Sequence, residues 1–287
     1  MSPVRLLQRI AVCHNADPSA FEPWSVDGAV VGRVHRQRVA RLLAAPSPFR
    51  RVHGRLELSA ADLEARSRAV AEWLPGLVAD GEIRTLTGEL YAAAPADGSA
   101  PRLAVDRAAV AWLGVRAAGV HLNGYVRAAD GLHLWVARRA RDKRTFPGHL
   151  DNLVAGGQAD GLSALATLHK EAHEEAGLPG ALLAPARAVG SLHYVQQDGL
   201  SWKPDTLALY DVELPRDFVP RPVDGEVESF QCWPLPRVVQ SLLDDEPWKP
   251  NCALVAIDFL LRHGGLDREL GGADRWRLWT ALHGQVA

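Results

Sequence analysis

Cysteine and methionine are scarce in this sequence of 287 residues, which contains three cysteines and one methionine. Cys13, Cys232 and Cys252 lie far apart, and no two of them have the CxxC spacing of a zinc or redox site. An odd number of isolated cysteines argues against a disulfide framework and fits a reducing compartment. We expect the three thiols to serve as small apolar side chains.

The sequence also lacks any apolar run of the roughly 18 residues that a membrane-spanning helix needs. Arg5 and Arg9 interrupt the apolar positions near the beginning, so no signal peptide is expected there. The 32 basic and 34 acidic side chains give a formal net charge of -2, which provides no footprint for bulk nucleic-acid or membrane binding. The composition therefore predicts a cytoplasmic protein whose partner is a small molecule, and it leaves the oligomeric state open.

Hydrophobic residues make up 47% of the chain, which is enough for a sizeable core. In the first part we expect strands at 29–34, 49–58 and 85–93, and helices at 37–45, from a Ser59 cap to Leu74, and at 107–114. In the second part we expect strands at 120–128, 132–139, 188–196, 206–213 and 227–233, and helices at 162–176, 236–243, 251–263 and 274–283. This alternation predicts an α/β (α+β) protein with an N-terminal accessory domain over 1–115 and a second domain over 116–287.

A glycine-rich turn at 156–161 leads into a helix that carries three carboxylates. Glu171, Glu174 and Glu175 are spaced i, i+3 and i+4, so they share one face of that helix. No basic residue follows one turn further on, and a hard divalent cation such as Mg²⁺ or Mn²⁺ would relieve their repulsion. A solvated acidic face is the alternative interpretation of these three residues alone.

The full spacing resembles the box that defines the Nudix hydrolases. Seven residues stand at matching positions of that box: Gly156, Glu171, Ala172, Glu174, Glu175, Gly177 and Leu178. Two positions depart from the box. Leu162 stands where the family has a glutamate, and Lys170 stands where it has an arginine. The resemblance implies a mixed sheet sandwiched between helices and a metal-dependent hydrolase that cuts a diphosphate linkage, with the later glutamates as metal ligands.

Segments outside the box are similar to the Nudix subfamily associated with thiamine pyrophosphokinase, whose members carry an extra, DUF4743-like N-terminal domain. These segments are 119–125, 134–139, 147–157, 217–228 and 249–264. That resemblance implies a substrate such as thiamine diphosphate, or an oxidised analogue of it, which is cut to the monophosphate.

Basic residues precede the box at a strand end and in the loop that follows. Arg138, Arg139 and Lys143 are suited to bind a diphosphate tail, since guanidinium and ammonium groups are its natural partners. A solvated basic turn is the alternative. The remaining predicted substrate-binding residues are Asn152, Gly156 and Gly157. The rings of the substrate would then lie in an aromatic-lined cleft at the domain junction.

Glu226 stands at the start of a predicted strand, where Nudix proteins often place a further glutamate as metal ligand or base. Glu226 and Glu174 are the two candidates for the catalytic base that takes the proton of the attacking water. Leu162 is expected to pack into the core beneath the helix, because an ion pair with position 170 cannot form there. Two other functions stay open: hydrolysis of a nucleoside diphosphate derivative, and a non-catalytic sensor that binds a diphosphate.

Overall fold

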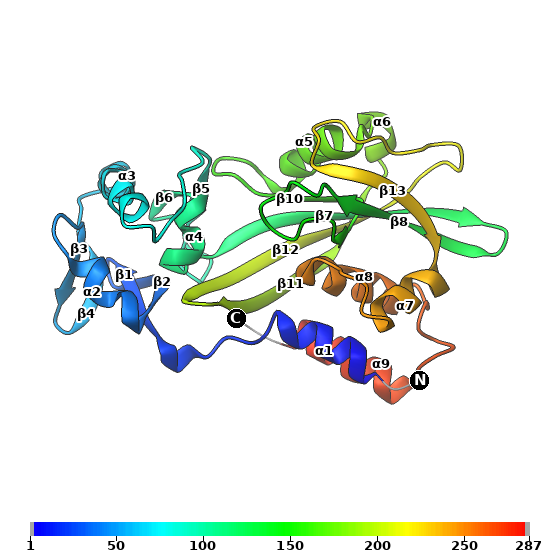
Figure 1. Ribbon diagram of the computed structural model, residues 1–287, viewed down its shortest axis with the longest axis horizontal. Helices are drawn as coiled ribbons and strands as arrows, with labels where there is room; N and C mark the ends of the chain where they lie inside the picture. The colour runs from blue at the N-terminus through cyan, green and yellow to red at the C-terminus, as the bar shows by residue number, and fades with distance from the viewer. Residues whose placement is uncertain (1–2, 285–287) are drawn as a thin grey trace.

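The computed structural model describes residues 3–284. Figure 1 shows a smaller part that contains strands β1–β6 at one end and a larger part built on long strands. The smaller part contains β1(Phe21–Val26), β2(Ala29–His35), α2(Val39–Leu43), β3(Phe49–Val52), β4(Arg55–Leu58), α3(Leu63–Ala79), β5(Leu90–Ala93), β6(Leu103–Asp106) and α4(Arg107–Leu113), with short 3-10 turns at Pro18–Ala20 and Arg36–Arg38.

The smaller part has its own apolar core. Its four-stranded sheet has the order β2-β1-β4-β3, and β5 and β6 form a separate antiparallel pair. Rings pack edge to face beneath this sheet, with centroids 5.2 Å apart for Trp24 and Phe49 and 5.5 Å apart for both Phe49–Trp73 and Trp73–Trp112. Large aromatic contacts of this kind allow a small domain to bury enough surface to be stable.

Three expectations for this part differ from the structure. The strand expected over 49–58 is a hairpin, because His53 and Gly54 have φ of 47° and 81° and turn the chain. The helix cap is Asp62, whose side chain accepts the Ala65 N–H at 2.8 Å, and the helix continues past Pro75. Only Leu90–Ala93 of the strand expected over 85–93 forms. Leu77 is fully buried beyond the proline, and its packing outweighs the tendency of Pro75 to end the helix.

The larger part contains β7(Ala117–Ala128), β8(Gly131–Arg139), β9(Leu150–Asp151), β10(Val154–Gly157), α5(Ala164–Ala176), α6(Gly180–Leu183), β11(Arg187–Asp198), β12(Ser201–Glu213), β13(Val227–Pro234), α7(Leu235–Leu243), α8(Pro250–Arg262) and α9(Gly272–His283). Its sheet has the order β11-β12-β7-β8-β13, with β10 added to β7 and β9 to β8. Strands β7 and β12 are parallel, and the remaining pairs are antiparallel.

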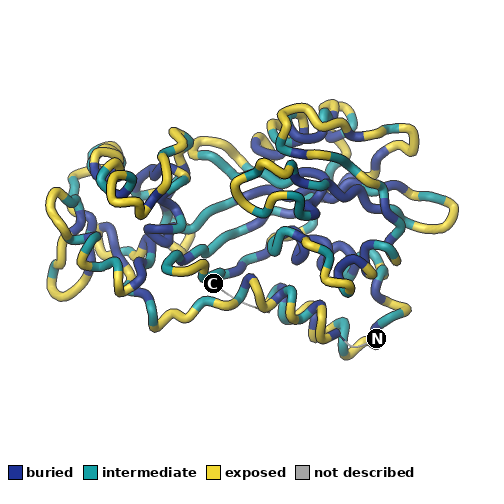
Figure 2. The backbone as a smooth tube through the Cα atoms, viewed as in Figure 1, coloured by how far each residue is buried: buried dark blue, intermediate teal, exposed yellow. Residues whose placement is uncertain are grey.

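Helices cover both faces of this mixed sheet. Helices α5 and α6 lie on one face, and α7 and α8 lie on the other (Figure 1). Strands β7 and β8 between them are largely buried, and the exposed residues lie in the loops and on the outer sides of the helices (Figure 2). The protein is therefore the α/β sandwich that the sequence predicts, preceded by a smaller α/β part.

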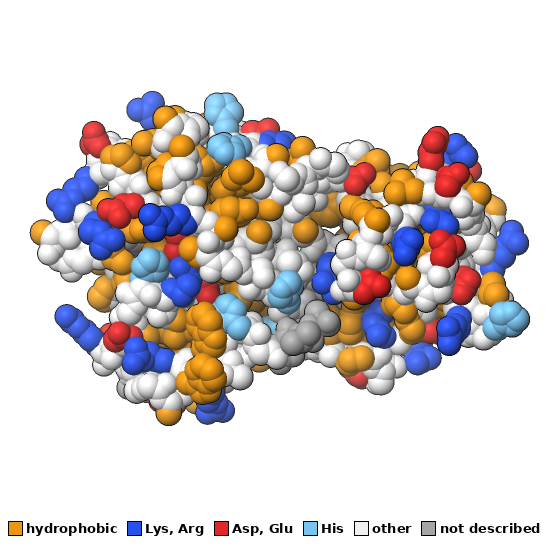
Figure 3. All heavy atoms as spheres, turned by 180° about the vertical axis from the view of Figure 1, so that it is seen from behind, with side chains coloured by type: hydrophobic (Ala, Val, Ile, Leu, Met, Phe, Trp, Pro, Cys, Tyr) orange, Lys and Arg blue, Asp and Glu red, His pale blue; other side chains and the backbone are white. Residues whose placement is uncertain are grey.

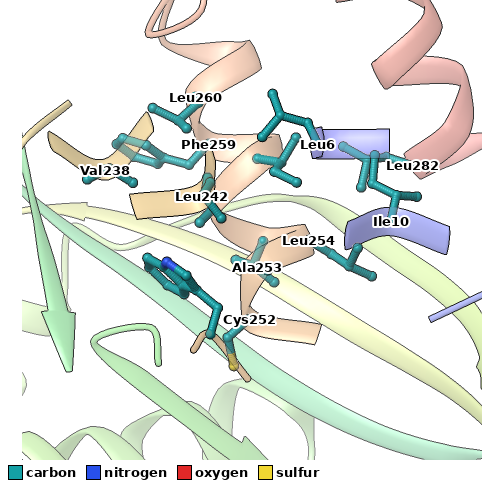
Figure 4. Packing of buried hydrophobic residues seen from close by; sticks show 14 of the residues in the cluster. Leu6, Ile10, Val238, Leu242, Cys252, Ala253, Leu254, Phe259, Leu260 and Leu282 are labelled. Carbon is teal, nitrogen blue, oxygen red and sulfur yellow. The ribbon is translucent and has the colours of Figure 1, made fainter. Parts of the chain in front are cut away.

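The first helix, α1(Val4–Val12), packs with the larger part of the protein although it begins the chain. Its Leu6 and Ile10 are 0% and 3% exposed and lie beside Leu254 of α8 and Leu282 of α9 (Figure 4). The Arg9 Nε also donates to the backbone oxygen of Leu242 at 2.6 Å. The division near residue 115 remains a prediction, but residues 4–12 contribute to the core on the other side of it.

Charges of both signs are interspersed over the face shown in Figure 3, without a broad region of one sign. Within residues 3–284, no helix combines the length and the apolar character needed to cross a membrane.

Candidate active site

The turn from β10 into α5 brings the helix and its carboxylates close to the sheet. Strand β10 pairs with β7, and Ser163 caps the helix by accepting the Ala166 N–H at 3.1 Å. A β-carbon at Gly156 would overlap the side chain of Glu171. Glycine at this position therefore allows Glu171 to lie directly against the end of β10.

The three glutamates of α5 occupy three different environments. Glu175 is buried and accepts the backbone N–H of Ala155 at 2.9 Å. Burial raises the pKa of Glu175 to about 8, and the nearby charge of Asp151 acts in the same direction. Burial also raises the pKa of Glu171, whereas the side chain of Glu174 is 44% exposed.

Lys170 compensates part of this negative charge. Its Nζ lies 2.8 Å from Glu174 Oε2 and 3.0 Å from Glu171 Oε1, and the hydrogen bond with Glu174 is the main cause of its raised pKa. No basic residue stands one turn after the carboxylates, but Lys170 relieves two of them from the preceding side. This cation stands one turn before Glu174 and next to Glu171.

The donor set on α5 fits a hard divalent cation. All three side chains offer carboxylate oxygens, and in two of them burial raises the cost of ionisation, which a bound cation would offset. The three glutamates would therefore suit Mg²⁺ or Mn²⁺ as ligands. Their oxygens are not gathered within 4.8 Å of one another in the described part of the chain.

The described residues contain a second group of possible ligands, His121, Asp151 and Cys252, whose ligand atoms lie within 4.8 Å of one another. The Cys252 thiol donates to Asp151 Oδ1 at 2.6 Å. Arg139 and Lys249 lie 3.0 and 3.6 Å from Asp151 Oδ2. Asp151, the one carboxylate of this group, already lies beside two cationic side chains, which disfavours metal binding. We therefore interpret the group as a buried hydrogen-bonded network.

A cleft of about 990 Å³ opens between the two parts of the protein. The larger part lines it with Gly156 and Gly157, with Tyr194, and with the charged side chains Arg139, Lys143 and Glu226. The smaller part lines it with Thr85, Leu86, Thr87, Tyr91, Arg107, Val110 and Ala111. A cleft at the domain junction with aromatic rings in its walls is therefore present, and most of its other lining is polar.

Five of the predicted site residues meet at this cleft, and Glu171 lies behind Gly156. Lys143 Nζ pairs with Glu226 Oε2 at 2.7 Å. Burial acts to raise the pKa of Glu226, but Lys143 and Arg139 lower it overall, so this carboxylate is ionised at neutral pH. Arg139 donates a hydrogen bond to the Asp151 carboxylate and another to the Thr145 backbone oxygen at 3.2 Å.

Two predicted substrate contacts have other roles in the structure. Arg138 donates to the Gly148 backbone oxygen at 2.8 Å, and it does not line the cleft as the described residues form it. Asn152 is 3% exposed, and its Oδ1 lies 2.7 Å from Nδ1 of His121, which is itself buried. Successive side chains of a strand point to opposite faces. Arg138 therefore points away from the face of β8 that carries Arg139, and this explains why it does not line the cleft.

The expectation that Leu162 is buried beneath the helix was wrong. Leu162 is 36% exposed and lies in the turn before the helix, because α5 begins only at Ala164. Gly161, with φ of 79°, directs the chain through that turn. The Gln158 side chain donates to the Leu162 backbone oxygen at 2.6 Å and supports the turn.

Tyr91, Arg107, Lys249, Tyr194 and Asp205 line the cleft but were not predicted as site residues. Tyr91 and Arg107 lie in the part of the chain before the Nudix-like region, so no motif pointed to them. Lys249 belongs to a segment that contributed to the resemblance, and its position as a partly buried lysine beside Asp151 becomes evident only when the chain folds.

Comparisons with known proteins match two family models to this chain. The family model "Domain of unknown function (DUF4743)" matches residues 5–117, and the family model "NUDIX domain" matches residues 119–253. A solved Deinococcus radiodurans protein has 22% identity and a TM-score of 0.46 over 61% of this chain and 99% of its own. The Nudix domain of Shewanella oneidensis NrtR, solved with ADP-ribose, has 14% identity and a TM-score of 0.42 over 52% of this chain and 88% of its own.

Curated relatives match over most of the chain. Nudix hydrolase 20, chloroplastic, of Arabidopsis thaliana is 38% identical over 263 residues, which are 88% of this chain and 70% of that protein. Nudix hydrolase 24, chloroplastic, of the same plant is 36% identical over 256 residues, again 88% and 70%. Because the similarity extends through both parts of the structure, the protein belongs to the Nudix hydrolase family and is a pyrophosphohydrolase that acts on acid anhydrides.

Proposed function

We propose that the protein hydrolyses a phosphoanhydride bond in a small organic diphosphate and releases the monophosphate, with Mg²⁺ or Mn²⁺ as cofactor. One observation carries the proposal. Glu171 lies directly behind Gly156, and Gly156 lines a cleft that also presents Arg139 and Lys143. Carboxylates for a cation and basic groups for a diphosphate therefore lie on the two sides of the same short strand.

Glu171, Glu174 and Glu175 are the residues that would hold the cation. A divalent cation at such a site neutralises phosphate charge and lowers the pKa of water. The buried Glu175 is fixed by the Ala155 N–H, which anchors this face of α5 to β10.

Glu226 is the better placed of the two candidates for the base. It lines the cleft and is ionised, whereas Glu174 is paired with Lys170 on the partly exposed side of the helix. A base must reach the water that attacks phosphorus, and a cleft-lining carboxylate satisfies that condition. Lys143, at 2.7 Å from Glu226, keeps the carboxylate in position and deprotonated.

Thiamine diphosphate, or an oxidised analogue of it, is the substrate that we propose. The sequence resemblance outside the box supports this choice, and the cleft offers Arg139 and Lys143 for the tail and the rings of Tyr91, Phe146 and Tyr194 for the flat part. The volume of about 990 Å³ also accommodates a nucleoside diphosphate derivative, which is the alternative substrate class.

Hydrolysis across a panel of diphosphates tests the proposal. Thiamine diphosphate, its oxidised analogues, ADP-ribose and nucleoside triphosphates are compared at matched Mg²⁺ and substrate concentrations. We expect the highest kcat/KM for the thiamine compounds. A clear preference for a nucleotide would overturn the thiamine assignment and leave the hydrolase assignment intact. Tight binding of a diphosphate without any hydrolysis would favour a sensor.

A further inference from the structure

Strand β5 of the smaller part lies against the turn that carries the glycines of the active site. The backbone N–H of Asp160, between β10 and α5, donates to the Leu90 oxygen at 2.7 Å. A β-carbon at Gly157 would overlap the hydroxyl of Tyr91, the next residue of β5. The smaller part therefore contacts the turn through both backbone and side chain.

Tyr91 is buried at this contact. It is 5% exposed, and burial raises the pKa of its phenol, with Glu89, Glu171 and Asp205 acting in the same direction and Arg107 opposing them. The phenol is therefore neutral at physiological pH. Its hydroxyl is a hydrogen-bond donor within electrostatic range of Glu171, the carboxylate that lies against Gly156.

Arg107 reaches the same cleft from the beginning of α4. Its position is fixed by Asp106, whose side chain accepts the N–H groups of Gly88 and Ala108, both at 2.8 Å. The guanidinium lies 6.0 Å from the centre of the Tyr91 ring and pairs with Glu89 at 2.8 Å. Glu226 acts on its charge from the larger part. Arg107 thus lies beside Tyr91 and within electrostatic range of the proposed base.

The cations of the cleft differ in how readily they can exchange their partner for a phosphate. The pair of Arg139 with Asp151 is buried, with side chains 9% and 6% exposed, and breaking it would leave the buried carboxylate with the more distant Lys249 as its cation. The pair of Arg107 with Glu89 is open to solvent, with side chains 56% and 34% exposed. Exposed pairs contribute little stability, so Arg107 can leave Glu89 for a phosphate at small cost.

We propose that the smaller part completes the substrate site: Arg107 binds the diphosphate of the substrate, and Tyr91 positions the Gly156–Gly157 turn against Glu171. The inference rests on the proposed function, because it assumes that the cleft takes a diphosphate. It also accounts for the departures at Leu162 and Lys170. The turn is supported by β5 through Leu90 and Tyr91, and it does not need the ion pair that those two positions usually form.

Binding of methylenediphosphonate, a diphosphate that cannot be hydrolysed, tests the role of Arg107 directly. Calorimetry with Mg²⁺ present compares wild type with Arg107→Gln and with Arg107→Lys. We expect Kd to rise about 10-fold or more in Arg107→Gln, the loss of one charge-assisted hydrogen bond, and less in Arg107→Lys. Glu89→Gln is the matched control, since it breaks the same surface pair but keeps the cation, and we expect it to bind as tightly as wild type or more tightly.

An unchanged Kd in Arg107→Gln would overturn the role of Arg107, and so would a failure of the wild type to bind methylenediphosphonate. This binding measurement does not depend on turnover of a substrate. If the wild type binds the analogue through Arg107 but hydrolyses no diphosphate in the panel, the proposed function fails and the binding role stands. If hydrolysis occurs and Arg107→Gln has an unchanged KM, the binding role fails and the proposed function stands.

Tyr91→Phe tests the positioning role, because it keeps the ring and removes only the hydroxyl. We expect kcat to fall about 10-fold while KM and the thermal midpoint stay close to wild type, since the diphosphate contacts and the ring packing remain. A fall in the thermal midpoint with unchanged kcat would show a purely structural hydroxyl and would overturn this part of the proposal.

Discussion

The carboxylate of Glu175 accepts the backbone N–H of Ala155 at 2.9 Å. This bond joins the acidic face of α5 to strand β10 at the residue before Gly156. Because Glu175 is buried, the hydrogen bond also satisfies a polar side chain that is shielded from water. The helix and the glycine turn are therefore joined directly, and we expect a change in one of them to alter the position of the other.

Gly156→Ala should lower activity through Glu171. The added methyl group would overlap the Glu171 side chain, which must then rotate away from the cleft wall. We expect kcat/KM to fall at least about 10-fold and the free energy of unfolding to fall by about 1–3 kcal/mol, the usual cost of overpacking. Gly180→Ala is the control, since nothing lies within 4 Å of its added carbon. Equal activity in the two variants would contradict the close packing described at Gly156.

Arg262 should be a major contributor to stability. It pairs with Asp211 and with Asp258, whose side chains are 7% and 2% exposed, and so connects α8 to β12. Arg262→Met removes the guanidinium shared by the two buried carboxylates and leaves them His263 and His283 as partners, and we expect a loss of about 3–5 kcal/mol in urea unfolding. Arg127→Gln, which removes an exposed ion pair with Glu213, should leave the urea midpoint nearly unchanged. A small effect of Arg262→Met would mean that other groups compensate the two carboxylates.

His121 should make the protein less stable in mild acid. Burial, with the Lys249 charge next in size, lowers its pKa from 6.5 to about 4 in the folded state. The unfolded state therefore binds more protons between these values, and this contribution to stability is complete above about pH 6.5 and is lost as the pH falls toward 4. The full effect is roughly 3 kcal/mol. Urea unfolding of wild type and His121→Gln at several pH values should give a shallower pH dependence for the variant; parallel curves would refute the assignment.

The sequence predicted the helices and strands whose apolar or charged residues recur at a regular spacing. The i, i+3, i+4 spacing placed Glu171, Glu174 and Glu175 together on α5, and the long strands β7, β8 and β12 were expected close to where they lie. Local signals failed where tertiary packing decides. Helix α3 continues through Pro75 because Leu77 is buried beyond it, and Leu162 is exposed because the turn at Gly161 delays the start of α5.

The cleft itself could be predicted only in part. Arg139, Lys143 and Glu226 lie close to the box or in segments that resemble the subfamily, so the sequence identified them. Tyr91 and Arg107 precede the box by more than 40 residues and reach the cleft only because β5 packs against the turn. Contacts between segments so far apart have no periodic signature, and the N-terminal part of the site was therefore missed.

The central claim is that Glu174 and Glu175 hold the cation required for hydrolysis. Replacing either with Gln keeps its volume and removes a carboxylate that could ionise to bind the cation, and Glu72→Gln on the exposed face of α3 serves as the control. The measurement is kcat on the best diphosphate of the panel as Mg²⁺ is titrated, with circular dichroism to confirm the fold. We predict that kcat falls by orders of magnitude in Glu174→Gln and Glu175→Gln at saturating Mg²⁺ and is unchanged in Glu72→Gln. Turnover near the wild-type value in both site variants, with the fold intact, would contradict the account.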